Sequence, residues 1–115
     1  MNAPIQHQGL QGETWRKLSF FEQMAHVGSE VERALRWKQK NQTQLMQKAA
    51  FRAIELLSFT IDAHRKIKGR IRELSRVKEC LQDTFYADNQ YNSQDAQWQS
   101  YFRAFTYGAN LRARR

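Results

Sequence analysis

Residues 19–40 read SFFEQMAHVGSEVERALRWKQK, and this stretch has the marks of a long amphipathic helix. Ser19 and Glu22 form a capping-box pattern, in which the serine hydroxyl accepts from the third backbone amide of the helix and the glutamate accepts from the serine amide. Apolar residues then recur three or four positions apart, at Phe20, Met24, Val27, Val31, Ala34 and Leu35. Gly28 lies beside this stripe, and we expect its missing side chain to let another helix approach closely.

Three further stretches carry a helical spacing of apolar residues, and we expect helices over residues 43–64, 69–87 and 93–112. Asn92 or Ser93 is expected to cap the last of them. The 43–64 stretch is apolar over much of its circumference, so we expect it to be the most buried helix, and part of its apolar surface is a candidate contact between copies of the chain.

The number of residues that favour turns also indicates the fold class. Only 5 Gly and 1 Pro occur among 115 residues, which disfavours the frequent turns of a sheet protein. The chain is therefore predicted to be all-α, a single antiparallel (up-down-up-down) four-helix bundle over residues 15–115. Residues 1–14 are polar and are predicted to form a flexible N-terminal tail.

The setting of the protein is predicted from what the sequence lacks. The single cysteine, Cys80, can form neither an internal disulfide nor a site with several thiolate ligands. We see no signal-peptide pattern, and no apolar run approaches the roughly 20 residues of a membrane helix. We expect a soluble cytoplasmic protein with no cofactor, no metal site and no membrane contact.

The histidines are the candidates for catalysis or metal binding. His26 has Glu22 and Glu30 four residues to either side, a spacing that is typical of a solvated helix ridge more often than of a metal site. His64 is expected to end the second helix, where the dipole favours a cation. Neither has the upstream arginine that small helical nucleases of the HEPN family carry, and no phosphate-binding loop or nucleophile elbow occurs. We predict that the protein is not an enzyme.

Basic residues give the strongest functional signal. Lys and Arg number 19 against 11 Asp and Glu, a formal net charge of +8. Lys68, Arg72 and Arg76 are spaced four apart, so their like charges share one helix face and oppose one another by about 0.2–0.5 kcal/mol per pair. We expect a partner to supply the missing negative charge, and nucleic acid is the usual partner of such a field. The alternative is a basic face that is solvated and screened by salt.

The predicted nucleic-acid-binding residues are all basic and fall into a central patch and an outer set. The patch is Arg65, Lys66, Lys68, Arg70, Arg72 and Arg76, and the outer set is Arg36, Lys40, Lys48, Arg52, Arg112, Arg114 and Arg115. We expect them to contact phosphates and not to read bases, so binding should be sensitive to salt. Tyr86, Tyr91 and Tyr107 are the aromatic residues expected to lie off the core stripes.

Residues 15–24, 28–34, 52–57 and 101–105 resemble a family of small, uncharacterised bacterial proteins, a likeness that implies no activity. In architecture, size and charge the chain also resembles the accessory variability determinants (Avd) of diversity-generating retroelements. Those proteins are basic four-helix bundles that form a pentameric barrel and bind a reverse transcriptase and RNA. The resemblance implies an accessory role, and it carries over no residue roles.

Three functional hypotheses follow. The leading one is a non-enzymatic accessory protein that binds RNA, or less readily DNA, through its basic face, acts as a homo-oligomer and has a reverse transcriptase or another protein as a further partner. The second is a protein-interaction module whose basic face docks an acidic partner, such as a polymerase or an antitoxin-like protein. The third is a helical nuclease or metal protein.

Overall fold

The computed structural model describes residues 13–113, and within this part the chain is helical with no strand. The predicted all-α class is therefore confirmed. Residues 1–12, most of the predicted tail, and residues 114–115 lie outside the described part. The five helices are α1 (Glu13–Arg16), α2 (Phe20–Gln39), α3 (Thr43–Ala63), α4 (Lys68–Tyr86) and α5 (Asp95–Ala113).

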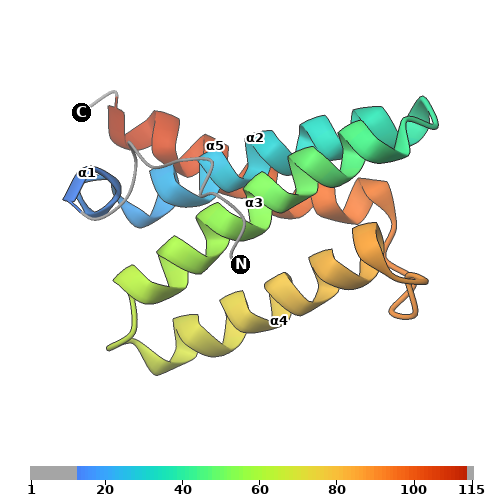
Figure 1. Ribbon diagram of the computed structural model, residues 1–115. Coiled ribbons are helices and arrows are strands. Elements are labelled where there is room, and N and C mark those ends of the chain that lie inside the picture. The colour runs from blue at the N-terminus through green and yellow to red at the C-terminus, as the bar shows by residue number, and fades with distance from the viewer. Residues whose placement is uncertain (1–12, 114–115) are drawn as a thin grey trace.

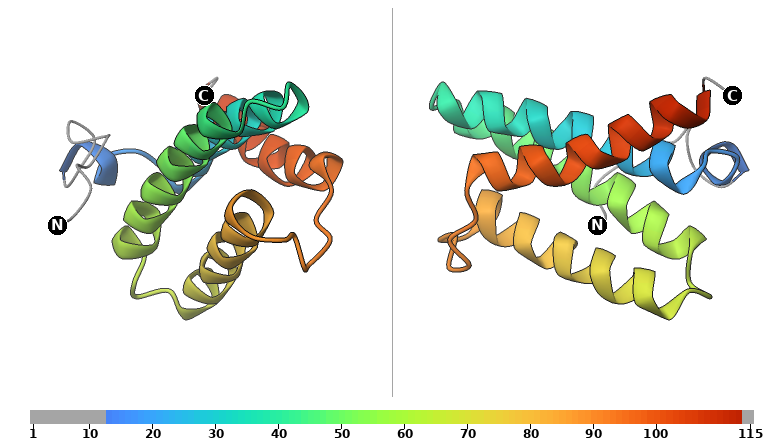
Figure 2. Two further views of the ribbon diagram at one scale, coloured as in Figure 1. Left: turned by 45° about the vertical axis from the view of Figure 1, so that its right-hand side comes forward. Right: turned by 180° about the vertical axis from the view of Figure 1, so that it is seen from behind.

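The long helices pack around α2 and α3. α2 packs against both α3 and α5, whereas α4 packs mainly against α3. Each long helix turns back relative to the one before it, and α4 is splayed away from α2 (Figures 1 and 2). The arrangement is a helical bundle in which α4 and α5 meet only weakly, and a closed antiparallel four-helix bundle stays a prediction.

The most buried helix is α2, and the prediction that this would be the 43–64 helix is wrong. Eight residues of α2 are buried, against six of α3. α3 is the more apolar helix, yet Phe51, Ile54, Phe59 and Ile61 on it remain partly exposed. The reason is position: each of these helices has two long neighbours, but α5 packs along α2 more extensively than the splayed α4 packs along α3.

Gly28 lets α5 approach α2, as predicted. A Cβ atom at Gly28 would lie 2.8 Å from the Cβ atom of Phe102 on α5, closer than two carbon atoms can pack. Further along the same pair of helices, a Cβ at Gly108 would lie 3.0 Å from the ring of Phe21. The glycines therefore set how closely these two helices approach.

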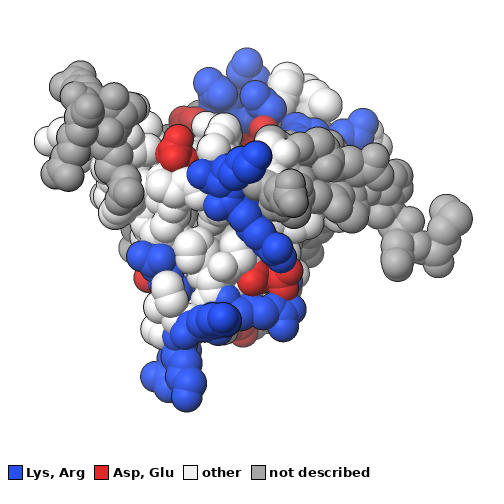
Figure 3. Space-filling model, turned by 90° about the vertical axis from the view of Figure 1, so that its left-hand side faces the viewer, with Lys and Arg blue, Asp and Glu red and all other residues white. Residues whose placement is uncertain are grey.

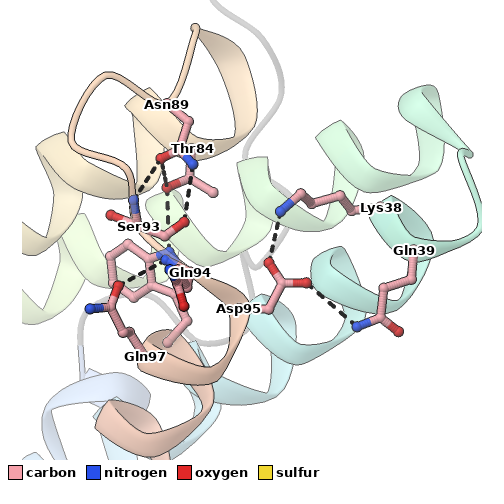
Figure 4. A network of polar contacts seen from close by, with 9 residues as sticks. Lys38, Gln39, Thr84, Asn89, Ser93, Gln94, Asp95 and Gln97 are labelled. Carbon is pink, nitrogen blue, oxygen red and sulfur yellow. Dashed lines mark hydrogen bonds and ion pairs between the residues drawn. The ribbon is translucent and has the colours of Figure 1, made fainter.

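The helix starts are fixed by local hydrogen bonds. The capping box at α2 is confirmed: the Glu22 amide donates to Ser19 Oγ at 3.1 Å, and the Ser19 amide donates to Glu22 Oε1 at 2.9 Å. The expected cap of the last helix by Asn92 or Ser93 is wrong. α5 begins at Asp95, where the Gln94 amide donates to the side chain of Gln97 at 2.8 Å (Figure 4).

The short helix α1 was not predicted, and a single residue ties it to the core. Trp15 is 1% exposed, and its indole N–H donates to Thr60 Oγ1 on α3 at 3.2 Å. Its carbonyl oxygen accepts from Gln23 Nε2 on α2 at 2.8 Å. α1 therefore lies against the ends of α2 and α3 that are near the α3–α4 turn. None of the described helices has the length and apolar character needed to cross a membrane.

Candidate nucleic-acid interface

The exposed cations of the predicted patch lie on the α3–α4 turn and along α4. Lys66, Lys68, Arg72 and Arg76 are all exposed, and between residues 13 and 113 none of them forms an ion pair. We call these four residues the α4 basic face. Figure 3 shows Lys and Arg side chains gathered on the end of the molecule that carries the α3–α4 turn, with few acidic side chains among them.

The acidic residues of α4 are engaged elsewhere and do not neutralise this face. Glu73 accepts from the Tyr101 hydroxyl on α5 at 2.7 Å, and Glu79 accepts from the Tyr91 hydroxyl at 3.0 Å. Asp83 accepts from the backbone amides of the α4–α5 loop at 2.8 and 3.0 Å. Burial, followed by the contact with Glu73, raises the pKa of Tyr101, so its phenol keeps the proton that it donates. Acids and cations are therefore segregated on this helix.

The first turn of α4 adds to the positive potential. Ile67 occupies the cap position without a side-chain hydrogen bond to the helix, and the first turn holds no acidic residue. Lys68 and Arg70 stand instead at the positive end of the helix dipole, where cations are disfavoured. The start of α4 is consequently an electropositive part of the described surface.

Two members of the predicted patch have partners inside the protein. Arg65 Nε lies 2.6 Å from Asp62 Oδ1, although both side chains are exposed. Arg70 is partly buried, and its guanidinium carbon lies 4.0 Å from the centre of the Phe20 ring. We therefore leave Arg65 and Arg70 out of the α4 basic face.

His64 occupies the C-cap position of α3, as expected, but it does not act as a dipole-stabilised cation. Its Nε2 atom lies 3.0 Å from Gln23 Oε1, which must accept because Gln23 Nε2 donates to a carbonyl oxygen. Its Nδ1 atom lies 3.4 Å from an Arg70 nitrogen. Burial, followed by the positive charge of Arg70, lowers the pKa of His64. The ring is therefore a neutral link between α2, α3 and α4.

The outer set does not join the α4 basic face. Arg36, Lys40 and Lys48 lie near the α2–α3 turn, whereas the α4 basic face begins at the α3–α4 turn, at the other end of α3, a helix of 21 residues and about 30 Å. Arg52 forms an ion pair with the buried Glu30 at 2.7 Å and so stabilises the contact between α2 and α3. The side chain of Arg112 and residues Arg114 and Arg115 lie outside the part whose side chains are described.

One basic residue near the patch was missed. Arg16 of α1 lines a hollow of about 320 Å³ together with Arg65, Lys66 and Ile67 of the α3–α4 turn. Arg16 reaches this hollow because α1 docks against α3, and no spacing of residues in the sequence indicates that docking.

The three tyrosines expected to lie off the core are all exposed. The ring centre of Tyr91 lies 6.0 Å from the Arg76 guanidinium.

The histidine ridge expected on α2 does not form. Glu30 is buried against Arg52 and Arg33, so it does not share an exposed surface with Glu22 and His26. Within residues 13–113, no three His, Cys, Asp or Glu side chains are grouped so that they could hold a metal ion.

No protein-family model, no curated protein sequence and no solved structure matches this chain.

Proposed function

We propose that this protein is a non-enzymatic accessory protein that binds RNA through the α4 basic face. The observation that carries the proposal is the segregation of charge on α4, where Lys68, Arg72 and Arg76 share one exposed face and the acids hydrogen-bond to neutral donors. Cations that repel one another and form no ion pair within the described residues are stabilised by an anionic partner. The phosphate backbone of RNA supplies such charges in a regular row.

One support for the non-enzymatic part of the proposal is His64. A general base needs a ring nitrogen that can reach a substrate proton. Both ring nitrogens of His64 already have partners, on Gln23 and on Arg70. The residue therefore suits a structural role.

The wider setting of the proposal comes from the resemblance to accessory variability determinants. Three features support this setting: the helical architecture, the size of 115 residues and the net charge of +8. On this proposal the chain is an antiparallel four-helix bundle that acts in the cytoplasm as a homo-oligomer, with a reverse transcriptase as a protein partner.

The test is charge reversal, read by the fluorescence anisotropy of a labelled structured RNA. Arg72→Glu and Arg76→Glu should each weaken binding about tenfold or more, because each removes a charge-assisted contact. Arg103→Glu, an equal charge change at an exposed position of α5, is the matched control and should change the affinity much less. Circular dichroism checks that each variant stays folded.

Equal weakening by Arg72→Glu and Arg103→Glu would show that net charge, and not the α4 basic face, determines binding. Polyglutamate that displaces RNA at equal charge concentration would favour the competing interpretation, an acidic protein as the partner.

A further inference from the structure

A second basic surface lies at the opposite end of α3, on the last two turns of α2. Arg33, Arg36, Trp37 and Lys40 line a hollow of about 310 Å³ there. Their spacing of three and four places them on one ridge of the helix. This ridge differs from the α4 basic face because an aromatic ring lies among its cations.

Trp37 is the one tryptophan of the three that is not buried. Trp15 is 1% exposed and Trp98 7% exposed, whereas Trp37 packs against the core and still reaches the surface. The Lys40 ammonium lies 5.5 Å from the centre of the Trp37 ring. A flexible, exposed side chain therefore covers the ring, and a ligand can displace it.

The cations around Trp37 divide into those with partners and those without. Lys38 turns away from the ridge to Asp95 at the start of α5, at 2.7 Å (Figure 4), and Arg33 pairs with Glu30 at 3.0 Å. Neither Arg36 nor Lys40 forms an ion pair within the described residues. Two uncompensated cations thus flank the indole.

We infer that this ridge is a stacking site for an unpaired nucleotide, with the base on Trp37 and its phosphates against Arg36 and Lys40. Aromatic side chains beside cations are how proteins bind single strands without reading their sequence. A base offers the indole a larger contact than the exposed ammonium of Lys40, which is then free to meet a phosphate. The inference rests on the proposed function and deepens it, since it assigns single-stranded RNA as the ligand class.

The full-length protein is titrated with an oligouridylate of about 12 nucleotides, a length within the site sizes of single-strand-binding proteins. The comparison ligands are an abasic strand of the same length, a duplex of the same length and inorganic phosphate. Tryptophan emission reports stacking, and the anisotropy of labelled strands reports binding separately.

We expect the oligouridylate to quench tryptophan emission and the other three ligands to leave it nearly unchanged. Trp37→Phe should abolish the quenching, because Trp15 and Trp98 are buried. Trp37→Ala should weaken binding of the oligouridylate roughly 5- to 150-fold and leave binding of the abasic strand unchanged. Tyr107→Ala removes an exposed ring on α5 and is the control that should change neither reading.

Quenching by the abasic strand or by phosphate, quenching that persists in Trp37→Phe, or unchanged affinity of Trp37→Ala would each overturn the inference. If strands bind by anisotropy without any quenching, the stacking site is wrong and the proposed function stands. If quenching occurs and Arg72→Glu leaves binding intact, the stacking site stands and the α4 basic face is wrong.

Discussion

Replacing Gly28 by alanine tests how α2 and α5 are held together. The new Cβ atom would lie 2.8 Å from the Cβ atom of Phe102. That atom is fixed to the backbone of α5 and cannot rotate away, so the whole helix has to move. Gly69→Ala is the matched control, because a Cβ at Gly69, in the first turn of α4, meets nothing within 4 Å.

Both substitutions gain stability because alanine favours a helix more than glycine does, and only Gly28→Ala also loses stability through overpacking. Alanine in place of helical glycine stabilises by about 0.5–1 kcal/mol, less near a helix end. Overpacking at Gly28 opposes this by about 1–3 kcal/mol. Because the favourable term is a few tenths of a kcal/mol smaller at Gly69, the free energy of unfolding of Gly28→Ala should lie about 0.5–2.5 kcal/mol below that of Gly69→Ala. In a domain of 115 residues this corresponds to roughly 4 °C in melting temperature per kcal/mol.

Urea unfolding followed by circular dichroism gives the comparison, with the slope of each transition checked for constancy. A difference below about 0.5 kcal/mol, or a Gly28→Ala protein more stable than Gly69→Ala, would refute the close approach of α5 to α2. The same result would remove the packing reason for glycine at this position.

Three further predictions concern the core, the α3 cap and assembly. Since burial and a neighbouring guanidinium lower the pKa of His64, the unfolded chain takes up this proton first, and stability should fall as pH drops below the usual value of 6.5. Urea midpoints across pH should show a smaller fall in His64→Gln than in the control His26→Gln, and equal falls would contradict the role of His64. Thr60→Val leaves the buried Trp15 N–H without its acceptor and should lower the free energy of unfolding by about 1–3 kcal/mol, more than Ser58→Ala at a partly exposed site. Light scattering should give a mass that is a multiple of 13.7 kDa, and a mass of 13.7 kDa itself would refute the homo-oligomer.

The parts of the fold that the sequence predicts are those set by neighbours along the chain. The capping box at Ser19 and the apolar stripe after it involve residues within one or two helical turns, so they are visible as a pattern. Gly28 was placed correctly for the same reason, since its position beside that stripe is a local fact. Helix α1 has four residues, too few to show a period, and its place depends on the burial of Trp15.

The candidate site likewise has a part that local spacing predicts and a part that depends on contacts between helices. Charge spacing along one helix correctly predicts that Arg72 and Arg76 share an exposed face, because both the spacing and the exposure belong to α4. It does not reveal that Arg52 pairs with Glu30 or that Arg70 lies over Phe20, because those partners come from other helices. The basic residues fall into two groups, near the α2–α3 turn and near the α3–α4 turn, and the length of α3 sets the distance between these turns.

The central claim, that the α4 basic face binds the RNA backbone, is tested most directly by the salt dependence of binding. For a single strand, each phosphate contact lowers the logarithm of the affinity by about 0.7 for each tenfold rise in salt concentration. The four residues of this face predict a slope of magnitude about 2.8 or more. Joint reversal of Arg72 and Arg76 should lower that magnitude by about 1.4. A slope near zero, or a slope that the two reversals leave unchanged, would contradict the claim.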